Sequence, residues 1–174
     1  MSGLLTVCKR EWSAYFSTPV AYVFVLIFLM MSAALTFYLG NFYDRGQADL
    51  QPFFNFHPWL YLFFMPAIAM GLWSQERQLG TIELLLTLPL TQAQVVSGKF
   101  LAAWLFAALA LVLTFPLWLT VNYLGDPDNG VILTSYLGSW LMAGAFIAVG
   151  CCMSALSRNQ IVAFILTVLI CFVL

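Results

Sequence analysis

Few residues of this 174-residue chain are of a type that could do chemistry. The single histidine, His57, stands next to Pro58 and has no serine or cysteine at a spacing typical of a nucleophile. We therefore expect His57 to be a polar anchor at a membrane edge, like its neighbour Trp59. The cysteines have neither the spacing of a metal site nor that of a disulfide framework, and we interpret them as small apolar residues. They are Cys8, Cys151, Cys152 and Cys171.

Polar residues with an informative spacing occur in one segment, ERQLGTIELLLTLP, from Glu76 to Pro89. In a helix, this segment would place its polar residues on one stripe at steps of four, three and four, and leucines would cover nearly everything else. That stripe is Glu76, Gly80, Glu83 and Thr87. An apolar helix of this kind must lie against the membrane face, pack on a soluble partner, or do both. The alternative is a simple re-entry hairpin that turns at Pro89.

The dipeptide Gly98-Lys99 does not belong to a phosphate-binding loop. It is followed by Phe100, and the glycine that such a loop needs upstream is absent. The chain itself is therefore not expected to hydrolyse ATP.

Composition defines the environment of these residues. Apolar and aromatic residues make up 63% of the chain, charged residues only 7%, and the mean hydropathy is +0.97. Soluble domains carry about 25% charged residues, so a soluble enzyme is nearly excluded and lipid is the solvent for most of the chain. A net charge of -1 provides no basic field for a nucleic-acid backbone, which excludes nucleic acid as a partner.

Uncharged apolar runs predict an all-α integral membrane protein with five spans in a single domain over residues 1–174. The expected spans are 20–39, 58–73, 100–124, 131–156 and 161–174. Thr91-x-x-Gln94 forms a capping box before the third span, and Pro116 is expected to kink that span. Gly144, Ala148 and Cys152 form a ladder of small residues for close packing in the fourth span.

The spans hold no Asp, Glu, Lys, Arg or His, which argues against an ion-coupled carrier and against an intramembrane hydrolase. The fifth run has only 14 residues, so we expect the chain to be a fragment or to be truncated at its C-terminus. Alternating assignment of the loops places five of the six basic residues on one side, which predicts a multi-pass protein with a cytoplasmic N-terminus.

Residues 4–17 have the pattern of an amphipathic helix. Leu4, Leu5 and Cys8 share one face with the aromatic residues Trp12, Tyr15 and Phe16. We expect this helix to lie in the cytoplasmic interface, with Trp12 in the headgroup boundary and Lys9 and Arg10 toward anionic lipid. It either anchors the first span or transmits motion to it.

The run ERQLGTIELLLTLPLTQAQVVSGK, from Glu76 to Lys99, resembles the cytoplasmic signature of ABC-2 type transporter permeases. It is especially similar to the gliding-motility and nitrous-oxide-reductase accessory branch. The stretches KREWSAYFSTPVAY and FFNFHPWLYLFFMPAIAM resemble the opening and the second span of that branch, so the resemblance covers essentially the whole chain. Gln75 departs from the family, whose members often carry a second acid at this position.

The resemblance implies an ABC-2 type helical bundle with six spans per copy in the bacterial cytoplasmic (inner) membrane. It implies a pair of permeases, with a second copy or a paralogue, above two ATP-binding subunits that hold ATP and magnesium. Residues 76–98 would be the coupling segment that docks on the ATP-binding subunit. The candidate coupling residues are Glu76, Arg77, Gly80, Thr81, Glu83, Leu84, Leu85, Pro89, Gly98 and Lys99.

The sequence is consistent with three functions. The first is a permease subunit that moves an unidentified substrate with energy from a partner, and needs no cofactor or metal of its own. The second is a non-transporting membrane anchor or truncated scaffold that recruits a soluble partner. The third, a small integral-membrane enzyme, is weakened by the absence of ionisable residues from the spans.

Overall fold

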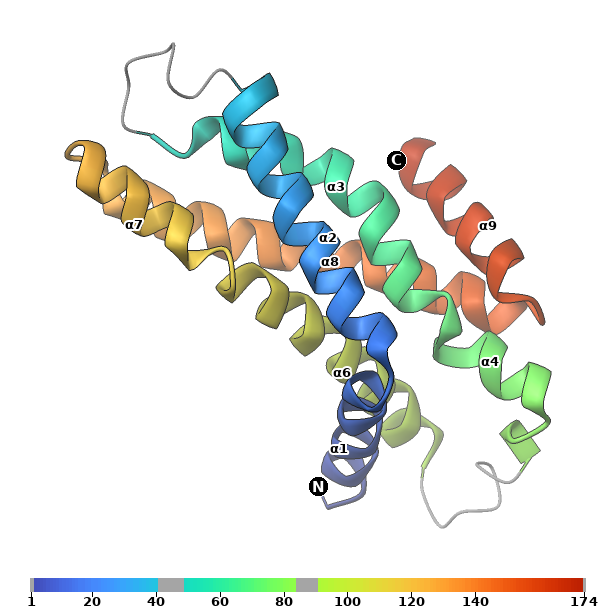
Figure 1. Cartoon of the computed structure of the whole chain (residues 1–174). Coiled ribbons are helices and arrows are strands. Elements are labelled where there is room, and N and C mark those ends of the chain that lie inside the picture. Colours follow the sequence, from blue (N-terminus) through green and yellow to red (C-terminus); the bar gives the residue numbers. More distant parts are fainter. Residues whose placement is uncertain (1, 41–48, 84–90, 174) are drawn as a thin grey trace.

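A computed structural model of the chain describes residues 2–40, 49–83 and 91–173. Within these ranges the chain is a bundle of long helices, with α1 lying across one end (Figure 1). The elements are α1 (Ser2–Ser17), α2 (Pro19–Ala34), the π-helix η1 (Leu35–Leu39), α3 (Gln51–Ala69), α4 (Gly71–Leu79), α6 (Gln92–Val112), α7 (Phe115–Leu124), α8 (Asn129–Leu156) and α9 (Gln160–Val173). The all-α membrane fold predicted from composition is confirmed. Backbone polar groups have no water to bond to in a bilayer, so helices that satisfy these groups internally are favoured.

Four helical segments are long and apolar enough to cross a membrane among the residues described, and they correspond to the first four predicted spans. They are Pro19–Leu39, Gln51–Leu79, Gln92–Leu124 and Asn129–Leu156. The fifth predicted span forms the shorter apolar helix Gln160–Val173. The second segment is longer than predicted, because its helix begins at Gln51 and continues through Pro58 and Pro66.

The earlier start of α3 moves His57 away from the helix end and into the interior. His57 is 1% exposed, and its ring lies edge-on to Phe53 at 4.3 Å between centroids. The prediction of an anchor at the membrane edge is therefore wrong. Neither ring nitrogen has a hydrogen-bond partner among the described residues.

The third segment starts and breaks where the sequence predicts. Thr91 and Gln94 form the expected reciprocal capping box, with Gln94 N donating to Thr91 Oγ1 at 3.4 Å. The helix is interrupted at Leu113 and Thr114, and α7 restarts with Pro116 in its first turn. Proline lacks the amide hydrogen and clashes with the preceding turn, which explains why the break comes just before Pro116.

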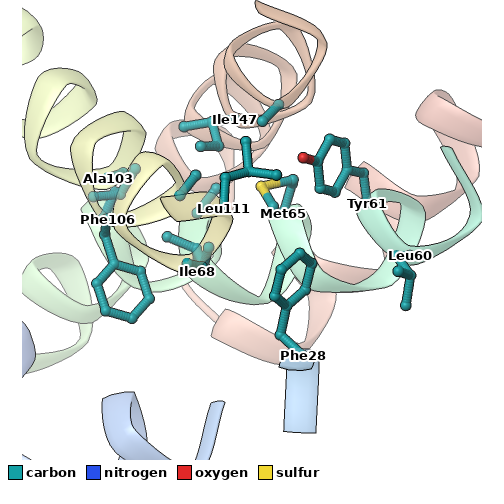
Figure 2. Close-up of a cluster of buried hydrophobic side chains, with 14 of the residues drawn as sticks. Phe28, Leu60, Tyr61, Met65, Ile68, Ala103, Phe106, Leu111 and Ile147 are labelled. Carbon is teal, nitrogen blue, oxygen red and sulfur yellow. The ribbon is translucent and has the colours of Figure 1, made fainter. Parts of the chain in front are cut away.

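One large core joins α2, α3, α4, α6 and α8. Figure 2 shows Phe28, Tyr61, Met65, Phe106 and Ile147 converging from four of these helices. Inside a bilayer this packing is stabilised by van der Waals contact, because lipid tails are as apolar as the side chains. Glycines on α8 allow the closest approaches. A Cβ at Gly150 would lie 2.5 Å from Ala69 Cβ, and one at Gly144 would lie 2.8 Å from Trp104 Nε1.

The predicted ladder of small residues on α8 packs within the chain at one of its three positions. Gly144 is buried, whereas Ala148 and Cys152 are exposed. The face that packs within the chain passes instead through Gly150 and Ser154. Spacing alone could not distinguish these two faces, because small residues occur on both.

The amphipathic helix forms as predicted, and its aromatic face contacts the main core. Tyr15 stacks on Phe106 of α6, with centroids 5.0 Å apart and rings inclined by 12°. Trp12 and Phe16 also pack against the main core. Trp12 is half-buried in this contact, and its place at the membrane interface stays a prediction. A protein groove of aromatic and alanine side chains offers these rings tighter contact than lipid would.

Candidate functional site

Four charged side chains from three helices meet at the end of the bundle where α1 crosses. We call Arg10 and Glu11 of α1, Glu76 of α4 and Lys99 of α6 the charge cluster. Lys99 Nζ lies 3.1 Å from Glu11 Oε1 and 2.9 Å from Glu76 Oε1. An Arg10 guanidinium nitrogen lies 2.6 Å from Glu11 Oε1 and 3.2 Å from Glu76 Oε1. Two cations therefore alternate with two carboxylates and connect α1, α4 and α6.

Lys99 is the buried centre of the cluster. The residue is 1% exposed, and its ammonium lies 5.5 Å from the centroid of the Trp73 ring. A buried ammonium is tolerated only with hydrogen-bonded counter-charges, and the two carboxylates and the ring face provide them. Loss of one partner from such a site leaves an uncompensated charge, so the cluster binds the three helices into one unit.

The outer part of the cluster is more open to solvent. The Arg10 side chain is 50% exposed, and a hydrogen bond to Glu11 raises the pKa of Arg10 above its ordinary value. Glu76 Oε2 is buried and has no hydrogen-bond partner among the described residues. Arg10 makes ion pairs within the protein and Lys9 is exposed, and the interaction of both with anionic lipid stays a prediction.

Close contact between α1 and α6 depends on Gly98. A Cβ at Gly98 would lie 2.9 Å from Val7 Cβ and 3.3 Å from the carbonyl oxygen of Leu4. The absence of a side chain at Gly98 lets α1 approach close enough for Glu11 to reach Lys99. Burial, and secondarily the Glu11 carboxylate, raise the pKa values of Cys8 and Tyr15 on the same helix.

The helix α4 ends in an exposed turn. Gly80 adopts a left-handed conformation with φ of 71°, and Thr81 N donates to Glu76 O at 3.0 Å while Gly80 N donates to Arg77 O at 3.4 Å. This pair of bonds is a Schellman motif, which glycine favours because it has no Cβ. The continuous helical stripe predicted from Glu76 through Gly80 to Glu83 is therefore wrong, because the helix stops at Leu79.

We call residues 77–83 the exposed tip. Arg77, Gly80, Thr81 and Glu83 all lie on its surface, and Leu79 is 68% exposed. The exposed tip thus combines an exposed leucine with polar and charged residues at the end of the second apolar segment. The tip continues directly from the helix that carries Glu76, so any displacement of the tip acts on the charge cluster.

The structure thus divides the predicted coupling residues into two groups. Glu76, Gly98 and Lys99 lie at the charge cluster, where Gly98 and Lys99 are buried and Glu76 is half-buried. Arg77, Gly80, Thr81 and Glu83 lie on the exposed tip. Leu84, Leu85 and Pro89 are outside the described residues, as is Thr87.

Two residues of the site were missed by sequence reasoning. Glu11 provides the second carboxylate, and Trp73 covers the ammonium of Lys99. The sequence did contain a signal for Glu11, since it is the one acid on an otherwise basic amphipathic helix. Nothing local pointed to Lys99 as its partner.

The described side chains of the charge cluster are joined by ion pairs. Within the described ranges no three His, Cys, Asp or Glu side chains converge in a way that could hold a metal ion. The Oε1 atoms of Glu11 and Glu76 both form ion pairs with Lys99. What this arrangement can do is transmit force between an exposed segment and the membrane-spanning helices.

Comparison with known families adds an independent finding. The sequence model described as ABC-2 family transporter protein matches residues 5–174. No curated protein matches the chain. The matched region includes every helix of the bundle and both parts of the site.

Proposed function

Because the chain belongs to the ABC-2 transporter family, we propose that it is a permease subunit coupled through its exposed tip to a separate ATP-binding subunit. Membership of the family makes it the transmembrane component of an ABC transporter. The finer proposal is that residues 76–98 receive the movement of the partner, which holds ATP and magnesium. The non-transporting anchor is not favoured by the family assignment.

The observation that carries this proposal is the connection between the tip and the spans. The tip is exposed, yet the same short helix places Glu76 against Lys99 and Arg10. A partner that pushed on the tip would therefore move α1 and α6 together with α4. We propose that closure of an ATP-binding dimer moves the tip as a lever and that the packed spans rock as a body.

We further propose that this end of the bundle is cytoplasmic in a bacterial inner membrane. Lys9, Arg10, Arg77 and Lys99 lie at this end, whereas Asp126 and Asp128 lie in the turn between α7 and α8. An excess of basic residues on the cytoplasmic side is the usual arrangement. The N-terminus would then be cytoplasmic.

The working unit in this proposal is a pair of permeases, formed with a second copy or a paralogue. The sequence similarity to the gliding-motility and nitrous-oxide-reductase accessory branch supports a place for the chain in that branch. Substrate class is not part of the proposal.

The first test is to purify the tagged chain in mild detergent from its native membrane and identify proteins that co-purify. We expect an ATP-binding subunit whose ATPase rate changes when the permease is present. Recovery of the chain without any such subunit, under conditions that preserve other transporters of the same membrane, would favour the anchor.

The second test is Glu83→Ala at the exposed tip, with Asp126→Ala as the matched control. Both remove an exposed acid, but Asp126 is at the opposite end of the bundle. We expect Glu83→Ala to reduce stimulation of the partner ATPase while insertion and yield are preserved, and Asp126→Ala to have no effect. Equal stimulation in both variants would contradict docking at the tip.

A further inference from the structure

The joint between α3 and α4 contains a hydrogen bond from another helix. The α3 helix ends at Ala69 and α4 begins at Gly71, and the two run in different directions (Figure 1). In a regular helix, Trp73 N would donate to Ala69 O. Here the helix is interrupted at Met70, and Trp73 N donates to Ser154 Oγ at 3.0 Å. Ser154 Oγ also accepts from Ser74 N at 3.1 Å and donates at 2.7 Å to Met70 O, which accepts from Ser74 Oγ as well. The hydroxyl of Ser154 thus takes the place of the Ala69 carbonyl as the acceptor for Trp73 N.

The hydroxyl of Ser154 is fully used at this position. Its O–H group donates to Met70 O, and its oxygen accepts from both Trp73 N and Ser74 N. The one donor and the two acceptor sites of the hydroxyl are therefore all occupied. Ser154 is 0% exposed and belongs to α8, far from the joint in sequence. Insertion of a side chain into the helical hydrogen-bond ladder is a recognised cause of a sharp bend.

The α8 helix holds the joint by two further contacts. One turn before Ser154, Gly150 approaches Ala69 so closely that a Cβ would lie 2.5 Å from Ala69 Cβ. Next to Gly150, Cys151 Sγ accepts a hydrogen bond from Trp73 Nε1 at 3.2 Å. These contacts place the Ser154 hydroxyl at the joint rather than elsewhere along α3.

Trp73 connects this joint with the charge cluster. Its backbone and indole N–H groups both donate to α8, and its ring faces the ammonium of Lys99. The direction of α4, the contact to α8 and the burial of Lys99 therefore depend on one residue. A change of angle at the joint would alter all three.

We infer that Ser154 sets the angle between helices α3 and α4 through its hydrogen bonds. We call this hydrogen-bonded arrangement of the Ser154 hydroxyl the latch. The latch has two arrangements. With Trp73 N bonded to Ser154 Oγ the joint is bent, and with Trp73 N bonded to Ala69 O it is straight. Such a two-state element is what coupling between distant parts requires. This inference rests on the proposed coupling function for its consequence in transport, but not for the latch itself.

The latch is tested by measuring the direction of α4 in lipid nanodiscs. Spin labels are attached to cysteines introduced at the exposed positions Gln78 and Leu141, after replacement of Cys8, Cys152 and Cys171 by serine. Cys151 is kept because it is buried and bonded to Trp73, and a chain with Cys151 alone reports any background labelling. Gln78 lies eight residues beyond Met70, about 12 Å along the helix, so a change of about 20° at the joint moves it by about 4 Å.

The variant is Ser154→Ala, and the matched control is Ser139→Ala. Both replace a buried serine of α8 that bonds to the α3–α4 segment, since Ser139 Oγ and Tyr61 Oη are 2.7 Å apart. We expect Ser154→Ala to shift the label distance by about 4 Å or to broaden it clearly, and Ser139→Ala to leave it unchanged. If Ser154→Ala is not monodisperse, Ser154→Gly removes the same hydroxyl.

An unchanged distance in the Ser154 variant, or an equal change in both variants, would overturn the latch. With the ATP-binding partner present, we expect Ser154→Ala to lower the stimulation of its ATPase about fivefold, the factor that corresponds to one hydrogen bond. A shifted distance with full stimulation would overturn the link between latch and coupling. Failure of even the parent chain to affect an ATP-binding subunit would refute the proposed function, while the distance measurement would still decide the latch.

Discussion

Replacement of Lys99 by methionine removes the buried cation of the charge cluster and keeps the length of the side chain. Glu11 and Glu76 then share only Arg10, whose side chain is 50% exposed. Breaking a buried ion pair by removing one partner costs about 3–5 kcal/mol, and both carboxylate side chains are 15% exposed, so we expect the lower value of about 3 kcal/mol. For a chain of this length that corresponds to a melting temperature lower by about 6–12 °C.

The assay is thermal unfolding in mild detergent, followed by the loss of the monodisperse peak in size-exclusion chromatography. Lys9→Met is the control, because Lys9 is exposed on the same end of the bundle and should change stability by less than about 0.5 kcal/mol. The double variant Lys99→Met/Glu76→Gln removes one of the two carboxylates left without their cation. We expect it to be more stable than Lys99→Met alone, because less uncompensated charge stays buried.

Together with the single variant Glu76→Gln, these variants form a double-mutant cycle. The cycle measures whether the effects of removing Lys99 and Glu76 on stability depend on each other. Independent losses that simply add would refute the idea that Lys99 and Glu76 compensate each other. A Lys99 variant as stable as the Lys9 control would refute the burial argument altogether.

Three further predictions concern the same end of the bundle. Gly98→Val should push α1 away from α6, because a Cβ at position 98 would clash with Val7 and the Leu4 carbonyl oxygen. Amide hydrogen exchange in residues 4–17 should therefore accelerate. The control is Gly138→Val, because a Cβ at position 138 would have no atom within 4 Å. Gly80→Ala should cost about 1–2 kcal/mol of stability, because alanine disfavours a φ of 71°, and unchanged unfolding would show that the turn has another conformation. Burial and the Glu11 carboxylate raise the pKa of the Cys8 thiol, so its thiolate fraction near pH 8 is smaller than that of free cysteine. Cys8 should therefore be alkylated by iodoacetamide more slowly than free cysteine is. In a chain with Cys8 as its only cysteine, Glu11→Gln should lower that pKa and speed alkylation; an equal rate would contradict the contribution of Glu11.

Local hydrogen bonding explains why some features of the fold could be predicted. The capping box at Thr91 and Gln94 and the break before Pro116 depend on atoms within four residues of each other along the chain. Span positions follow from the length of uncharged runs, since a bilayer excludes charges from its core. The stop of α4 at Gly80 was missed because the apolar periodicity continues past it, although the glycine itself was the local signal.

Side-chain partners could not be predicted, because they come from distant parts of the chain. Lys99 and Glu11 are 88 residues apart, and Ser154 lies 80 residues from Ser74. Such pairs exist only after the helices have packed and rotated to fixed faces. The same reason explains the error at His57, which is surrounded by other side chains of the protein.

The sequence by itself determined that this chain is an all-α membrane protein, where its long apolar helices lie, and which segment between the second and third of them is exceptional. These properties depend on hydropathy and on backbone hydrogen bonds, which are set locally. Only the tertiary structure decided that α1 packs on α6, that Lys99 is buried between Glu11 and Glu76, and that Ser154 is hydrogen-bonded at the joint between α3 and α4. Those contacts depend on which helix faces meet, and close packing rather than pattern selects the faces.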